Sequence, residues 1–170
     1  MAFDPNAICG PVLGTTAYSN NTLVGRNVNI TLPEVTPQTI DMQAMGTMSL
    51  PIWHLLEDLE FAITKIGTDL GLGAMLGGKK LSLEVRWAQE SVDGLGNLRE
   101  FGCKAFISGF PKIIPGSEIA PGETTENEMT YTVSRYQLIV DEEEIVKIDR
   151  FANQCFIAGT DYARDISTFL

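Results

Sequence analysis

Apolar and polar residues alternate along several segments of the chain, a period typical of β-strands with one buried face. Residues 81–87 and 101–108 place apolar side chains on one phase and mostly charged or small ones on the other. The same alternation occurs in residues 59–63 and, more briefly, in residues 28–32. We therefore expect strands to dominate the fold.

One further segment changes phase partway along its length. Apolar residues occupy odd positions from 129 to 133 and even positions from 136 to 140. An extra residue in one strand reverses the face that the following residues present, as a β-bulge does. The flip predicts a bulge near Ser134 and Arg135.

The segments between the strands predict two hairpins and a long loop. Residues 93–97, Asp-Gly-Leu-Gly-Asn, and the acidic residues 141–144 each separate two alternating runs, which is typical of hairpin turns. Residues 111–127 are rich in Pro, Gly, Ser and Thr. We expect them to form an exposed loop.

Two segments have helical features. Residues 68–76 begin with a threonine suited to capping and end at a glycine pair, which favours a short helix. Residues 160–170 predict a short C-terminal helix. Its apolar face would consist of Tyr162, Ile166, Phe169 and Leu170. Residues 51–58 fit either a helix, by their leucine spacing, or a strand that starts at Pro51.

Composition limits the class of protein. The 170 residues have a net charge of −10 and 44% hydrophobic residues, which fits a single folded domain over residues 1–170 and disfavours general nucleic-acid binding. No run approaches the roughly 20 apolar residues of a membrane helix, and residues 1–10 do not resemble a secretory signal.

The separated Cys9, Cys103 and Cys155 predict free thiols in a reducing compartment.

Candidate catalytic chemistry is sparse. His54 is the only histidine, and no serine lies in a nucleophile elbow, so no triad is predicted. Residues 73–80 approach a phosphate-binding loop, but Lys80 replaces the hydroxyl that would hold magnesium. Residues 141–144 lack the turn glycine and distal glutamate of a calcium loop. We expect no catalytic residue, no cofactor, no metal site and no enzyme activity.

Residues 39–56 contain three methionines and a tryptophan, yet only one acid and no base. Exposed apolar surface of this size usually marks a protein–protein contact. Burial in the core is the alternative, and the sequence leaves both open.

Two further runs of the sequence are distinctive when taken in order. The first is residues 30–40, I-T-L-P-E-V-T-P-Q-T-I, followed by Ala-Met-Gly at 44–46. The second is residues 136–149, an aromatic-containing strand, an acidic turn and an apolar strand that ends in Ile-Asp. Together they resemble the major tail tube proteins of contractile-tailed bacteriophages. The end of the chain, residues 161–170, is similar to the helical tail of that family. Two departures are Glu142-Glu143 in place of the usual Asp-Gly at the hairpin turn, and an N-terminal region without the basic stretch of many relatives.

The resemblance implies a mainly β fold, an antiparallel β-barrel or sandwich of the tail-tube type with one flanking α-helix and a short C-terminal helix. It implies rings of six copies, joined through sheet edges and stacked into the rigid inner tube of a contractile phage tail or phage-tail-like bacteriocin. The implied partners are other copies, the sheath, the baseplate, tail terminator proteins, and DNA that passes without specific binding. The implied location is a virion tail or tail-like particle assembled in the host cytoplasm. Two alternatives are a type VI secretion tube protein that carries effectors and a monomeric β-barrel that binds a small ligand.

The resemblance also suggests roles for particular residues. The segment at about 39–56 is the expected ring-to-ring contact, through Thr39, Ile40, Met42, Met45, Met48, Leu50, Ile52 and Trp53. Acids on the polar phase of strands are lumen candidates, namely Glu60, Glu84 and Glu100. The candidates for ion pairs between subunits are Arg86, Lys104 and Arg135. The chain termini are a second candidate for ring contacts.

Overall fold

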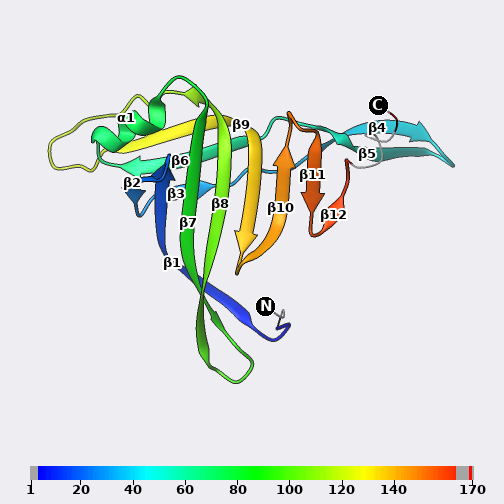
Figure 1. Ribbon diagram of the computed structural model, residues 1–170, viewed down its shortest axis with the longest axis horizontal. Helices are drawn as coiled ribbons and strands as arrows, with labels where there is room; N and C mark the ends of the chain where they lie inside the picture. Colours follow the sequence, from blue (N-terminus) through cyan, green and yellow to red (C-terminus); the bar gives the residue numbers. More distant parts are fainter. Residues whose placement is uncertain (1–3, 164–168, 170) are drawn as a thin grey trace.

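The computed structural model describes residues 4–163 and 169, and these are mainly antiparallel β-structure with one helix (Figure 1). In chain order the elements are β1 (Ile8–Ser19), β2 (Thr22–Arg26), β3 (Asn29–Thr31), β4 (Pro37–Gln43), β5 (Thr47–Leu56), β6 (Glu60–Ile66), α1 (Leu70–Leu76), β7 (Leu81–Val92), β8 (Leu98–Ile113), β9 (Glu126–Val140), β10 (Glu143–Asp149), β11 (Gln154–Ile157) and β12 (Thr160–Asp161). No helix among the described residues is long and apolar enough to span a membrane.

The strands form one large sheet and a separate pair. The main path of the large sheet is β12-β11-β10-β9-β8-β7-β1-β2, while β6 pairs with both β9 and β3, and β4 pairs only with β5. Figure 1 shows β3 and β6 crossing behind β7 and β8. The mainly antiparallel fold with a flanking helix is therefore confirmed.

The predicted bulge in β9 is confirmed, and it creates the two layers. Ser108 pairs with Arg135 and Gly109 pairs with Val133, so Ser134 is the extra residue. Before the bulge β9 pairs with β6, and after it β9 pairs with β10. Because a bulge bends its strand and increases the local twist, one strand takes part in both layers.

The core lies between these layers. Tyr131 is fully buried, and its ring centroid lies 5.9 Å from that of Phe61. The Tyr131 hydroxyl donates a hydrogen bond of 2.6 Å to the carbonyl of Met75 in α1. Burial raises the pKa of Tyr131, so the hydroxyl keeps its proton over the ordinary pH range. Tyr131 thereby attaches the helix to the sheet.

The sheet is not closed into a barrel, so the barrel form of the expected fold is corrected to an open, two-layered sheet. No ladder joins β2 to β6. Instead the buried Lys65 of β6 donates a hydrogen bond of 2.7 Å from Nζ to the carbonyl of Val24 in β2, and it also pairs with Asp69. Helix α1 packs against β2 so closely that a Cβ on Gly71 would lie 2.6 Å from the Val24 oxygen. A lysine and a short helix thus take the place of strand pairing.

Local expectations for the helices are partly wrong. Helix α1 is capped by Asp69 rather than by the expected threonine, since the Asp69 carboxylate accepts a hydrogen bond of 3.1 Å from the amide of Leu72. The expected helix over residues 160–170 begins as strand β12, because Ala158 and Gly159 at positive φ reverse the chain onto β11. Residues 164–168 and 170 of that expected helix lie outside the described residues.

The hairpins at residues 93–97 and 141–144 are confirmed, but the loop expected over residues 111–127 is shorter. Strand β8 continues to Ile113 and β9 begins at Glu126. Pro111 is tolerated inside β8 because its neighbour β7 begins at Leu81, which pairs with Gly109. The missing amide of the proline therefore faces no partner strand on that side. Residues 51–58, ambiguous in sequence, are extended up to Leu56.

The pairing of Lys65 with Asp69 predicts a pH-dependent stability. The hydrogen bond with Lys65 lowers the pKa of Asp69 from 3.8. A carboxylate whose pKa is lowered on folding stabilises the fold above its unfolded pKa, and this contribution is lost as the pH falls through the folded pKa. We expect the melting temperature of Asp69→Asn to be lower than that of the parent protein at pH 7. The difference between the two melting temperatures should shrink when thermal unfolding is followed below pH 3.8. An equal difference at both pH values would contradict the ion pair.

Candidate self-association surface

Strands β4 and β5 form a hairpin, residues 37–56, which we call the arm. It pairs with no other strand in the described part of the chain and projects from one end of the molecule (Figure 1). Its turn has Met45 at φ 51° and Gly46 at φ 128°, closed by a hydrogen bond of 2.8 Å from the Ala44 amide to the Gly46 carbonyl. Glycine is suited to the second of these positions because it has no Cβ.

The arm has one apolar face and one polar face. Met42 pairs with Met48 and Ile40 with Leu50. Cross-strand partners share a face, and side chains alternate along each strand. The apolar face therefore comprises Ile40, Met42, Met48, Leu50 and Ile52. The polar face comprises Thr39, Asp41, Gln43, Thr47 and Ser49.

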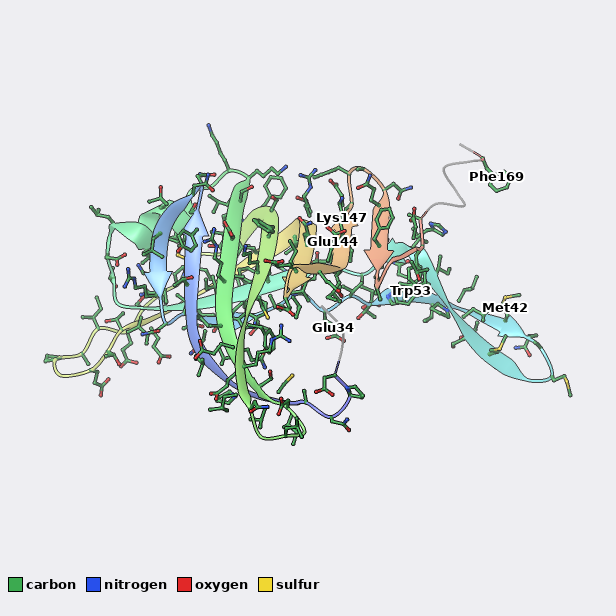
Figure 2. All side chains as sticks on the ribbon, turned by 60° about the horizontal axis from the view of Figure 1, so that its bottom comes forward. Glu34, Met42, Trp53, Glu144, Lys147 and Phe169 are labelled. Atoms are coloured by element: carbon green, nitrogen blue, oxygen red, sulfur yellow. The ribbon has the colours of Figure 1, made fainter. Side chains whose placement is uncertain are left out.

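The polar face is hydrogen-bonded within the arm, whereas the apolar face is open. Ser49 donates a hydrogen bond to Asp41. By contrast Ile40, Met42 and Met48 are each about half exposed. Figure 2 shows Met42 on the arm, far from the main sheet. Burial in the core is thus contradicted for the outer part of residues 39–56, and these methionines line no ligand cavity of a closed barrel.

The base of the arm lies against the C-terminal strands. The ring of Trp53 packs on Tyr162 with centroids 4.8 Å apart, and Figure 2 shows Trp53 where the arm meets the body. A cavity of about 340 Å³ between the arm and β10–β11 is lined by His54 and Arg150, among others. The Nδ1 atom of His54 is buried there without a hydrogen-bond partner in the described part of the chain.

The cavity has no arrangement suited to catalysis through His54. The carboxylate of Asp149, which also lines it, accepts hydrogen bonds from Arg135 at 2.6 and 2.8 Å and from the amides of Phe151 and Ala152 at 3.1 Å. Burial acts to raise the pKa of Asp149, but these hydrogen bonds lower it overall. Asp149 therefore orders a turn rather than an imidazole. Within residues 4–163 and 169, no group of three or more His, Cys, Asp or Glu residues is placed to hold a metal ion.

The three acids expected in a lumen are not brought together. Glu84 in β7 and Glu100 in β8 share the exposed face of the main sheet, because even-numbered residues of these strands pair with one another. Glu60 lies on β6, in the other layer, and pairs with Lys112. Glu84 pairs with Phe106 and Glu100 with Glu90, so these two acids share a face without being neighbours, and Glu60 is separate from both.

The three cations proposed for contacts between subunits differ in their surroundings. Arg86 pairs with Glu84 at 2.6 Å and lies 4.6 Å over the ring of Tyr18. Arg135 is held by Asp149 within the same chain. Lys104 is the cross-strand neighbour of Arg86 and has no ion pair in the part of the chain that is described. Two of the three candidates are thus already engaged inside the subunit.

Sequence reasoning missed the charged residues that surround the base of the arm, Asp58, Lys112 and Arg150. They come from separate parts of the chain, and nothing in their local sequence marks them as neighbours. The turn at residues 44–46 and the even-numbered apolar positions on both sides of it were the available signal for a hairpin.

Comparisons with known proteins identify relatives of this chain. The sequence model of a family described as "Phage tail tube protein FII" matches residues 14–170. A search of curated proteins finds no match. Among solved structures, a chain from "Cryo-EM Structure of an Extracellular Contractile Injection System, PVC sheath-tube complex in extended state" is similar with a TM-score of 0.52 at 14% identity. The likeness covers 76% of this chain and 90% of that chain, and at this identity it shows a shared fold.

Proposed function

We propose that this chain, which belongs to the phage tail tube protein FII family, forms rings that stack into the inner tube of a contractile particle. The proposal builds on the structural role that this family has in a tail tube. We take each ring to contain six copies, as the resemblance implies. The apolar face of the arm is the observation that supports this proposal most strongly. Monomeric proteins rarely expose a contiguous apolar surface without a partner, and methionine adapts well to a facing surface.

The open sheet supplies a second means of association. Strand β2 pairs only with residues 16–19 of β1, so residues 8–14 of β1 have a neighbour on one side only, namely β7. At the other end of the path, β12 pairs only with β11 among the described residues. Free strand edges join readily to other chains, and contacts between unlike surfaces close into rings when the rotation allows. We assign the edges to neighbours within a ring and the arm to contacts between rings.

The remaining roles are proposals of the same kind. Glu84 and Glu100 are lumen candidates, because a negative wall lets DNA pass without binding. Lys104, which has no ion pair within the described residues, remains a candidate for a contact with a neighbouring subunit. It lies on the same face of β7 and β8 as Glu84 and Glu100, so this contact and the lumen role are alternative proposals for that face. We propose the sheath as a partner, supported by the sheath-tube complex in which the structural neighbour occurs, and also the baseplate and tail terminator. We place assembly in the host cytoplasm and propose no catalytic activity for the tube.

The proposal is tested by electron microscopy and sedimentation of the purified full chain over a range of concentrations. We expect fast-sedimenting material to appear above a threshold concentration and to consist of hollow filaments with a regular axial repeat. A slowly sedimenting monomer at all concentrations, with no filaments, would remove the tube assignment.

A further inference from the structure

The arm leaves the body through residues 57–59, between β5 and β6. The amide of Glu57 donates a hydrogen bond of 2.9 Å to the carbonyl of Thr36, which closes the base of the hairpin. Leu59 is fully buried, and its carbonyl accepts a hydrogen bond of 2.8 Å from the amide of Val133. The arm is therefore rooted beside the bulge, where the two layers diverge.

Two cations from other parts of the chain converge on this root. Lys112, near the end of β8, lies with Nζ 3.4 Å from one carboxylate oxygen of Asp58 and also pairs with Glu60. Arg150 lies with Nη1 3.7 Å from the other oxygen of Asp58. Its Nη2 donates a hydrogen bond of 3.2 Å to the carbonyl of Leu56, the last residue of β5.

The backbone of Arg150 connects this cluster to the bulge. The amide of Arg150 donates a hydrogen bond of 2.9 Å to the carbonyl of Ser134, the bulge residue. The bulge thus places the backbone of Arg150 beside the root, and the hydrogen bond to Leu56 and the pairing with Asp58 place its guanidinium.

Part of the arm is separated from the body by a cavity. The cavity of about 340 Å³ lies between the arm and the body, with Gln38, Trp53 and His54 on the arm side and Arg150 and Asn153 on the body side. The contacts at the root are the packing of Leu56 against the core, the ring pair of Trp53 with Tyr162 and the charged cluster.

We propose that Asp58, Lys112 and Arg150 are positioning residues that hold the arm in one direction in the free subunit. Exposed ion pairs contribute little to stability, and Asp58 and Lys112 are both about half exposed. Their effect is instead to order the arm before it meets another copy, which removes part of the entropy cost of docking. This last step rests on the proposed function, whereas the ordering of the arm does not.

The ordering is measured directly with two spin labels. Gln43→Cys on the arm and Lys104→Cys on β8 are labelled in a Cys9→Ser background, since Cys9 is exposed and the other two cysteines are buried. We expect a narrow distribution of distances between the labels at a concentration below assembly. Adding Asp58→Asn and Arg150→Gln should widen that distribution at least about twofold and change the melting temperature no more than the control pair does.

The matched control breaks an ion pair of similar exposure away from the arm. Arg99 and Asp141 lie 2.7 Å apart near the hairpin turns of the main sheet, and we expect Arg99→Gln with Asp141→Asn to leave the distribution unchanged. An unchanged distribution in the Asp58 and Arg150 variant would overturn the proposal. So would a melting temperature well below that of the control pair, because the charges would then serve stability.

Assembly gives a second readout. We expect the Asp58 and Arg150 variant to form filaments only at a concentration about fivefold higher than the parent protein or the control pair. An equal threshold for all three proteins would contradict the link between arm direction and docking. If the parent protein itself forms no filaments, the proposed function fails, while the distance measurement still decides whether these residues order the arm.

Discussion

Replacing Met42 and Met48 by glutamate is expected to abolish filament formation and leave the subunit folded. The two side chains are cross-strand partners on the apolar face, each about half exposed in the single chain. Burying one methionine contributes about 1.5–3 kcal/mol, so losing two weakens each contact by about 3 kcal/mol. That corresponds to at least a hundredfold rise in the threshold concentration. Sedimentation of the variant over a range of concentrations measures the effect.

The arm itself offers the control. Gln43 and Thr47 are also cross-strand partners, one residue closer to the turn, and they lie on the polar face. Gln43→Glu with Thr47→Glu introduces the same two charges into the same two strands. We expect this variant to assemble within about threefold of the parent protein, because a rim charge changes affinity little. Equal loss of assembly in both variants would mean that charge on the arm, not its apolar face, is what matters.

Phe61→Ala is expected to lower the free energy of unfolding by about 3–5 kcal/mol, the range for removing a large aromatic side chain from a core. Phe61 is completely buried and packs against Tyr131 between the two layers. Urea unfolding of the monomer, below the threshold for assembly, measures the loss.

Two further variants make the core prediction specific. Tyr131→Phe keeps the ring but leaves the Met75 carbonyl without its hydrogen bond, and we expect a smaller loss of about 1–3 kcal/mol. Phe151 is 77% exposed, so Phe151→Ala should cost less than about 0.5 kcal/mol. If Phe61→Ala cost no more than Phe151→Ala, the arrangement of β6 behind the main sheet would be wrong.

The strands that face the core could be predicted because each presents one apolar phase over several residues. The bulge at Ser134 was visible for the same reason, since an extra residue shifts the phase of everything after it. The arm was harder to predict. Its apolar positions alternate, but Pro51 and the helical spacing of Leu55 and Leu56 obscured the strand. Whether the arm joins the large sheet also depends on which strands pair with which. The alternation of apolar and polar residues does not indicate pairing partners.

The open sheet was not predictable from local pattern. Lys65 is the next residue on the buried face that Leu59, Phe61 and Ile63 share. In the sequence, a charged residue at such a position indicates the end of a buried strand. It is buried because Val24 and Asp69, which come from different elements, supply partners for its ammonium group. The cluster at the root of the arm has the same origin, since Asp58 and Arg150 are distant in sequence and are brought together by the tertiary fold.

The central claim is that the apolar face of the arm is buried against another copy of this chain. A cryo-EM reconstruction of the filaments formed by the full chain tests it most directly. We expect Met42 and Met48 of every subunit to lie in van der Waals contact with a neighbouring copy. Filaments in which the apolar face of the arm points into solvent, with the copies joined through other surfaces, would contradict the account.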